Sequence, residues 1–273
     1  GHDGQIGLEE TPEQYIKAMV EVFSCVKDIL ADDGTLWLNI GDSYAGNNSQ
    51  ASNNGRAGFG NPRERVVNRT GEGLKSKDLI GIPWMLAFAL RADGWYLRQD
   101  IIWHKPNPMP ESVKDRCTKA HEYIFLLSKS KNYYFDYEAI KEPAQNWGTR
   151  DRSNFRSGTE DPLLKQHGLK CKEWEENPTR NKRSVWTVNT KPYKEAHFAV
   201  YPTELITPCI QAGCPVGGTV IDPFGGSGTT GYVADKLGRN ATLIELNPSY
   251  IDIAENRIDP PEQRLDPGLF TVE

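Results

Sequence analysis

Alternating helix and strand patterns predict an α/β fold whose sheet is mixed and mostly parallel. Residues 11–30 repeat apolar side chains at helical spacing, and a short apolar strand follows at residues 35–40. Further along, a strand that ends at Asp222 runs into a glycine turn and a helix, and residues 242–258 repeat a strand followed by a helix. Strands that alternate with helices are typical of parallel sheets, because each helix provides the crossover between two strands.

The predicted elements have recognisable start and stop signals. Thr11 is a predicted cap and Pro12 a first-turn residue of the first helix, which Gly34 helps to end. The predicted helices lie at residues 11–31, 84–92, 202–212, 227–237 and 248–258, and the predicted strands at residues 35–40, 95–103, 122–128, 220–222 and 242–246.

Composition predicts one large α/β domain with an insertion, or two small domains, in a soluble cytoplasmic protein. The 273 residues are 37% hydrophobic, the mean hydropathy is -0.61, and no apolar run reaches the length of a membrane span. The five cysteines are scattered and form no Cys-x-x-Cys pair, so we expect reduced thiols and no metal site. The net charge of -5 excludes a uniformly basic surface, but residues 56–77 and 141–183 are two segments in which basic residues outnumber acidic ones.

The most informative stretch is the glycine turn within residues 220–231. A phosphate-binding P-loop would need Lys and then Ser or Thr after the last glycine, where Tyr232 and Val233 stand. Ser227 lacks the second glycine that a serine nucleophile elbow requires. The glycine spacing does match the dinucleotide fingerprint, with Glu245 where a ribose-binding acid belongs. A nucleotide-like ligand and a glycine turn with no ligand remain as alternatives.

An acid directly before this turn favours a cationic ligand. Asp222 would repel the pyrophosphate of a dinucleotide from the start of the following helix. S-adenosylmethionine has an ammonium, a sulfonium and no phosphate, and its ribose hydroxyls suit a carboxylate such as Glu245. The residues therefore favour S-adenosylmethionine as the cofactor, with a dehydrogenase that binds a NAD-type dinucleotide as the alternative.

Two motifs resemble the cofactor motifs of DNA amino-methyltransferases, which methylate N4 of cytosine or N6 of adenine. They are Asp-Pro-Phe-x-Gly-x-Gly-Thr-Thr, starting at Asp222, and Ile-Glu-Leu-Asn-Pro-x-Tyr, starting at Ile244. The resemblance implies a Rossmann-like fold of the S-adenosylmethionine-dependent methyltransferases. It also implies a cofactor site made of Asp222, Phe224, Gly225, Gly226, Ser227, Gly228, Thr229, Thr230, Glu245 and Asn247. His197, Phe198 and Ala199 resemble a segment that closes over the methionine part, although a purely structural His197 is the alternative.

A second region resembles the part of these enzymes that lies beside the target base. The Trp-x-Lys-Pro sequence after strand 95–103 makes Trp103 and Lys105 base-side candidates, with prolines that only shape the strand exit as the alternative. Asp42, just past the carboxyl end of strand 35–40, is a further candidate because open α/β sheets bind ligands at such positions. The capping of a turn is an equal alternative for Asp42.

The resemblance divides the chain into a catalytic-side part (residues 1–130), a cofactor-binding part (184–258) and a C-terminal tail (259–273). Within the first part, residues 47–73 are a predicted mobile loop whose arginines suit phosphate groups. Residues 131–183 are a predicted insertion and the candidate target-recognition region. We expect double-stranded DNA as the partner, no membrane, and a prokaryotic or phage origin. A homodimer and a cognate restriction endonuclease are further expectations.

The catalytic loop of these enzymes, Ser/Asp/Asn-Pro-Pro-Tyr, is not found in the sequence. The adjacent prolines Pro260 and Pro261 lack the aromatic residue and follow the last predicted helix. In the motif order of these enzymes the loop comes first, so we expect it before residue 1. A catalytically silent DNA-binding module is the alternative. Methylation of cytosine C5 would need a cysteine after a proline, but the helical spacing around Pro208 and Cys209 predicts a packed core thiol.

Overall fold

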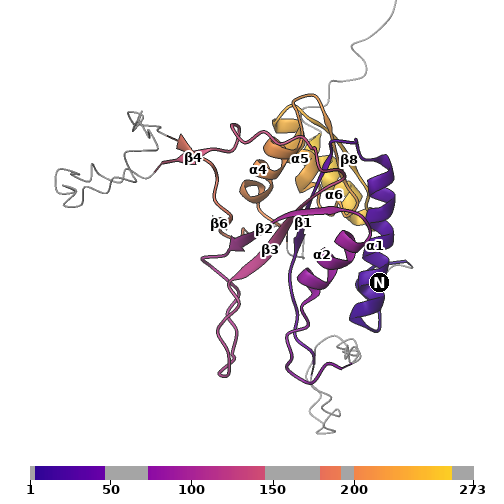
Figure 1. Ribbon diagram of the computed structural model, residues 1–273, viewed down its shortest axis with the longest axis vertical. Helices are drawn as coiled ribbons and strands as arrows, with labels where there is room; N and C mark the ends of the chain where they lie inside the picture. The colour runs from indigo at the N-terminus through magenta and orange to yellow at the C-terminus, as the bar shows by residue number, and fades with distance from the viewer. Residues whose placement is uncertain (1–3, 47–72, 145–178, 192–199, 260–273) are drawn as a thin grey trace, which may run out of the picture. The chain divides into compact units, whose positions relative to one another are not determined.

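The computed structural model describes residues 4–46, 73–144, 179–191 and 200–259. The chain divides into two compact units, of which the first is Gly1–Asp136 with Ser184–Glu273 and the second is Tyr137–Arg183. The first unit contains a four-stranded sheet, a two-stranded sheet and the helices packed on them (Figure 1).

The four-stranded sheet has the order β1-β3-β2-β6. Its strands are β1 (Thr35–Ile40), β3 (His121–Ser128), β2 (Tyr96–His104) and β6 (Val185–Thr187). β3 is antiparallel to both of its neighbours, and β2 is parallel to β6. Because β1, β2 and β6 therefore run in the same direction, their carboxyl ends meet at one edge of the sheet, together with the first residues of β3.

The predicted mixed sheet is confirmed, since β1, β2 and β6 run in one direction and β3 runs in the other. β1, β3 and β2 form two antiparallel pairs, and only β2 with β6 and β7 (Thr219–Asp222) with β8 (Asn240–Leu243) are parallel among the described residues. The opposite direction of β3 follows from residues 105–120, which join β2 directly to β3. A connection without a crossover helix returns the chain in the opposite direction.

Helices α1 (Pro12–Ile29) and α2 (Ile82–Ala92) pack on one face of this sheet. The Thr11 hydroxyl accepts a hydrogen bond from the Gln14 backbone N–H at 3.3 Å, and the Gln14 side chain accepts one from the Thr11 N–H, which confirms the predicted cap. The core beneath these helices is apolar and fully buried; it includes Phe23, Leu86, Leu90, Phe125 and Leu127. One residue of the predicted apolar stripe, Ile29, is instead 69% exposed at the last position of α1.

The opposite face of the sheet packs against α4 (Thr203–Gly213). Successive residues of a strand point to opposite faces, so Ile124 of β3 joins this second core while its neighbour Phe125 joins the first. Cys209 of α4 is buried in the second core, which confirms the predicted core thiol.

The C-terminal half of the first unit holds the glycine turn. β7 and β8 pair in parallel, α5 (Thr229–Lys236) connects them, and α6 (Pro248–Ile258) follows with the predicted bounds. β8 ends at Leu243, earlier than predicted, because the next carbonyl, that of Ile244, accepts a hydrogen bond from the Gly225 N–H at 2.8 Å. Glu245 therefore lies in the loop beyond the strand.

The second unit is described only around one short strand pair. β4 (Glu142–Pro143) is antiparallel to β5 (Thr179–Arg180), and the Glu142 carboxylate accepts hydrogen bonds from Arg180 at 2.8 Å and Arg183 at 2.6 Å. Residues 145–178 of the predicted insertion, like most of the predicted mobile loop, lie outside the described residues. Within the described part of the chain, no helix has the length and apolar character that a bilayer crossing requires.

The first core predicts a large stability loss for truncation at Leu86, which is 0% exposed. We expect Leu86→Ala to lower the free energy of unfolding by about 2–5 kcal/mol, because the change removes buried methyl groups and leaves a cavity. Ile29→Ala, at an exposed position of α1, is the matched control and should change it by less than about 0.5 kcal/mol. Urea unfolding followed by circular dichroism measures both, and equal effects would contradict the described packing.

Candidate functional site

The glycine turn is formed by close packing against two neighbouring elements. Gly226 and Gly228 have positive φ angles of 50° and 75°, which glycine adopts without strain. A Cβ atom on Gly228 would lie 2.9 Å from the Cα atom of Ala254 in α6, so a side chain does not fit there. A Cβ atom on Gly226 would meet only the Phe224 carbonyl oxygen, at 3.9 Å. The turn is thus closed toward α6 at Gly228 and open at Gly226.

Glu245 is fixed beside the open part of the turn. Its Oε2 atom accepts a hydrogen bond from the Gly226 N–H at 2.8 Å, and its Oε1 atom accepts one from the Asn247 N–H at 2.8 Å. Asn247 in turn caps α6, since its side chain accepts a hydrogen bond from the Ser249 N–H at 3.0 Å. Two backbone amides therefore orient the carboxylate and leave it further lone pairs for the hydroxyls of a ligand.

Asp222 ends β7 and is the centre of a hydrogen-bond network. Its Oδ1 atom accepts from the Phe224 N–H at 2.9 Å, while its Oδ2 atom accepts from the hydroxyls of Thr230 at 2.5 Å and Tyr201 at 3.1 Å. The Tyr201 and Thr230 hydroxyl oxygens are themselves 2.6 Å apart. Burial, and secondly the charge of Asp222, raise the pKa of Tyr201 well above its usual value, so the phenol stays protonated and donates.

The other polar side chains of the turn point into the protein. Ser227, Thr229 and Thr230 are only 3–8% exposed. The guanidinium of Arg257, in the last turn of α6, donates to the Thr229 hydroxyl at 2.8 Å and to the Ser227 hydroxyl and carbonyl, each at 3.3 Å. These hydroxyls, which the sequence places in the cofactor site, therefore hold the turn in shape. Phe224 is 45% exposed, and its ring packs edge-on against Phe23 of α1.

A cavity of about 860 Å³ lies against the turn, between β8 and α6. Gly225, Gly226 and Glu245, three predicted cofactor residues, line it together with the apolar side chains of Ile244, Ile251 and Ile258. Its charged lining residues are the acids Glu245, Glu255 and Asp259. Cavities of roughly 300–1,000 Å³ hold small ligands. An apolar wall with acids and no basic residue fits a nucleoside with positive charge, and it does not fit a pyrophosphate.

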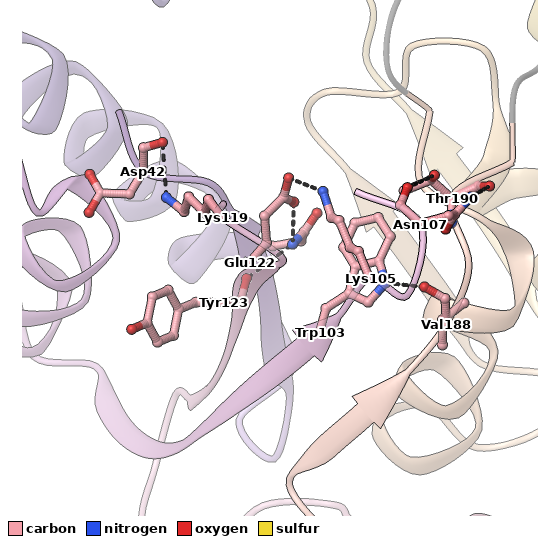
Figure 2. Close-up of polar contacts among 10 residues, drawn as sticks. Asp42, Trp103, Lys105, Asn107, Lys119, Glu122, Tyr123, Val188 and Thr190 are labelled. Carbon is pink, nitrogen blue, oxygen red and sulfur yellow. Dashed lines mark hydrogen bonds and ion pairs between the residues drawn. The ribbon is translucent and has the colours of Figure 1, made fainter. Parts of the chain in front are cut away.

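The base-side candidates form a second cluster at the edge of the four-stranded sheet, shown in Figure 2. Asp42 follows β1, and its Oδ1 atom accepts hydrogen bonds from the N–H groups of Gly81 and Ile82 at 2.9 and 3.0 Å. Gly81 is the N-cap residue of α2 and Ile82 is its first residue, so the carboxylate of Asp42 caps that helix. Its carbonyl oxygen accepts a hydrogen bond from Lys119 at 3.1 Å.

Trp103 and Lys105 lie together at the end of β2. Trp103 is 3% exposed, and its indole N–H donates to the Val188 carbonyl oxygen at 2.8 Å. The Lys105 ammonium lies 4.1 Å from the centre of the Trp103 ring and forms an ion pair with Glu122 at the start of β3 (Figure 2). Glu122 also accepts a hydrogen bond from the Asn39 side chain at 3.3 Å. Three strands thus contribute to one polar cluster.

Lys119 completes this cluster on the side of Asp42. Burial lowers the pKa of its ammonium, and the negative charges of Asp42 and Glu122 oppose that effect. The lysines of positions 105 and 119 therefore lie on either side of Glu122, as Figure 2 shows.

Sequence reasoning found some residues of these clusters and missed others. Tyr201 and Arg257 were missed, because their partners lie more than twenty residues away in the sequence. Glu122 was expected in a strand but not in the site. The predicted lid residues His197, Phe198 and Ala199 lie outside the described part of the chain, as do Pro260 and Pro261.

Comparison with known proteins identifies the family. The family model described as DNA methylase, for the N6 and N4 methyltransferases, matches residues 1–256. The chain belongs to the N6/N4 DNA methylase family. This DNA methylase is 49% identical over 255 residues to the Type II methyltransferase M.SmaI of Serratia marcescens. The matched region covers 92% of this chain and 76% of that protein. It is also 49% identical over 253 residues to M.Cfr9I of Citrobacter freundii, covering 92% and 73%.

Solved structures show the same fold. The PvuII DNA methyltransferase, titled as cytosine-N4-specific, matches the methylase with a TM-score of 0.61 at 16% identity, over 98% of this chain and 77% of that one. A complex of M1.HpyAVI with SAM matches with a TM-score of 0.53 at 16% identity, over 88% and 82%. The predicted DNA amino-methyltransferase, its α/β methyltransferase fold and its cofactor S-adenosylmethionine are thereby confirmed.

The hydrogen-bond network of Asp222 predicts an effect of Tyr201 on the cofactor. We expect Tyr201→Phe to weaken binding of S-adenosylhomocysteine about fivefold, because a lost hydrogen bond to a charged oxygen costs about 1 kcal/mol and Asp222 becomes less well oriented. Isothermal titration calorimetry measures the dissociation constant, and Tyr96→Phe, at a half-exposed tyrosine of β2, is the matched control. Unchanged cofactor binding by Tyr201→Phe would show that the network does not orient Asp222.

Proposed function

We propose that the glycine-turn cluster holds S-adenosylmethionine and that the cluster at the edge of the four-stranded sheet faces the target base of double-stranded DNA. The reaction is methylation of an exocyclic amine, N4 of cytosine or N6 of adenine. The observation that carries the assignment of the cofactor site is the carboxylate of Glu245, which two backbone amides fix beside the open face of Gly226.

Each end of the cofactor has a suitable partner in the glycine-turn cluster. Glu245 offers free lone pairs for the ribose hydroxyls, and the isoleucines of the cavity offer an apolar wall for the adenine. Asp222 supplies negative charge for the ammonium at the end of β7. When bound, the cofactor supplies a methyl group activated by the sulfonium charge. The residues of the turn orient it and need no proton transfer of their own.

On the base side, the geometry distinguishes supporting residues from exposed ones. Trp103 is buried and its indole N–H is hydrogen-bonded to the Val188 carbonyl. We therefore assign to it the role of positioning Lys105, whose ammonium lies over the Trp103 ring. The capping bonds of Asp42 support the alternative in which its carboxylate is structural. Lys105, Glu122 and Asn39 then form the polar surface nearest the base.

The remaining expectations concern recognition and partners. We assign reading of the DNA sequence to the predicted insertion, since base edges are reached by side chains on an added element. The similarity to Type II methyltransferases supports a cognate restriction endonuclease of the same specificity, acting in the cytoplasm. A homodimer is also proposed, and light scattering of the purified protein measures it.

Chemical analysis of methylated DNA tests the function directly. The purified protein is incubated with S-adenosylmethionine and duplex DNA, and the DNA is digested to nucleosides for mass spectrometry. We expect N4-methylcytosine or N6-methyladenine. The mass of the modified nucleoside identifies the base, and its chromatographic retention against methylated standards identifies the methylated atom. Cofactor binding without any methylated nucleoside would support the catalytically silent alternative.

Glu245→Gln tests the assigned cofactor site through the dissociation constant of S-adenosylhomocysteine, measured by isothermal titration calorimetry. We expect cofactor affinity to fall at least tenfold, roughly 1.4 kcal/mol, because a neutral amide replaces a charged acceptor of the ribose hydroxyls. Asp252→Asn, an exposed carboxylate of α6 outside the cavity lining, is the matched control and should bind the cofactor like the unchanged protein. If both variants bind equally well, Glu245 does not contact the cofactor.

A further inference from the structure

The segment that joins β2 to β3, residues 105–120, forms a projection that we name the β2–β3 finger. It leaves the edge of the sheet at which the base-side cluster lies and extends beyond the strand ends (Figure 1). Four basic residues, Lys105, Lys114, Arg116 and Lys119, and two acidic residues, Glu111 and Asp115, give it a net charge of +2 in a chain of net charge -5. A positive projection on an acidic protein suits the phosphates of DNA.

The first limb of the finger is stiff. Pro106, Pro108 and Pro110 restrict the backbone, since proline fixes its own φ angle and also limits the residue before it. Between them, Asn107 is hydrogen-bonded to Thr190 in both directions. Its side-chain amide donates to the Thr190 carbonyl at 3.1 Å, and its side-chain oxygen accepts from the Thr190 N–H at 3.0 Å.

The second limb is held by charged groups. Arg116 forms an ion pair with Glu111 at 2.5 Å, and its guanidinium lies 4.0 Å from the centre of the Tyr44 ring. Asp115 forms an ion pair with Lys77 at 2.8 Å. Tyr44 lies in the segment that follows β1, and Lys77 lies in the segment that precedes α2; these two segments are hydrogen-bonded to each other. Contacts with them hold the second limb of the finger, as the bonds to Thr190 hold the first.

Met109 stands out on this fastened finger. Its side chain is 85% exposed, more than any other large apolar side chain among the described residues. Because prolines flank it on both sides and Asn107 is anchored, the backbone holds Met109 away from the core. It lies four residues beyond Lys105, which belongs to the base-side cluster. A long, flexible apolar side chain at this place has the properties of the wedges that proteins insert between bases.

We propose that Met109 enters the DNA duplex and fills the space that the target base leaves when it flips out of the stack. The inference rests on the proposed methylation of double-stranded DNA. An enzyme that acts on an exocyclic amine must take the base out of the stack, which has an unstacking cost. An apolar side chain in the vacated space stabilises the opened duplex, while the basic residues of the finger contact the flanking phosphates.

The test compares two duplexes that carry the methylation site, as defined by sequencing of DNA modified by the wild-type protein. One duplex is fully paired, and the other has an abasic position opposite the target base, so that little pairing has to be broken. On the paired duplex we expect Met109→Ala to lower kcat/KM at least tenfold. On the abasic duplex the same variant should stay within about twofold of the wild type, because the cost that the wedge offsets is already absent.

Two further variants separate a wedge from a packing role. Met109→Leu keeps an apolar side chain of similar volume and should retain activity on the paired duplex. Val216→Ala removes another strongly exposed apolar side chain, 75% exposed and outside both clusters, and should match the wild type on both duplexes. Binding of S-adenosylhomocysteine should be the same for all four proteins.

The outcomes distinguish this inference from the proposed function. Full activity of Met109→Ala on the paired duplex, or an equal loss on both duplexes, would contradict the wedge alone. Absence of methylation by the wild-type protein on both duplexes would contradict the proposed function itself, and the wedge with it.

Discussion

The carboxylate of Asp222 is the interaction on which the cofactor half of the molecule depends. It receives hydrogen bonds from the glycine turn through Phe224, from α5 through Thr230, and from the chain just before α4 through Tyr201. A carboxylate that accepts several hydrogen bonds fixes the donors relative to one another. The end of β7, the turn and two helices are therefore tied to a single group. Removal of that group would leave the Tyr201 and Thr230 hydroxyls with only each other as hydrogen-bond partners in this network.

The base side has a comparable organisation around Glu122. Its carboxylate lies between Lys105 and Asn39, which come from the ends of β2 and β1. This arrangement exists because β3 runs antiparallel to its neighbours, so that its first residues meet their last ones. With a parallel β3, the start of that strand would lie at the opposite edge of the sheet. The antiparallel direction of β3 is thus what places an acid in the cluster.

The sequence was sufficient for features that depend on neighbouring residues. The cap at Thr11, the bounds of α6 and the glycine turn after Asp222 each follow from local residue types and spacing. It was not sufficient where two partners are distant in the chain. Nothing local shows that Tyr201 reaches Asp222 or that Arg257 reaches Thr229, and only the packing of α2 decides that Asp42 caps a helix. The direction of a strand is likewise a feature that local sequence does not determine, because it depends on which strands pair.

The position of Lys105 has a consequence for the thermodynamics of binding. A free lysine side chain on a surface samples many rotamers, and ordering it against a partner costs about 0.5–1.5 kcal/mol. Lys105 is held by Glu122 on one side and by the ring of Trp103 on the other, so folding has already removed most of that rotational freedom. A partner that binds the Lys105 ammonium therefore binds a preorganised side chain, and binding does not include the entropic cost of ordering it.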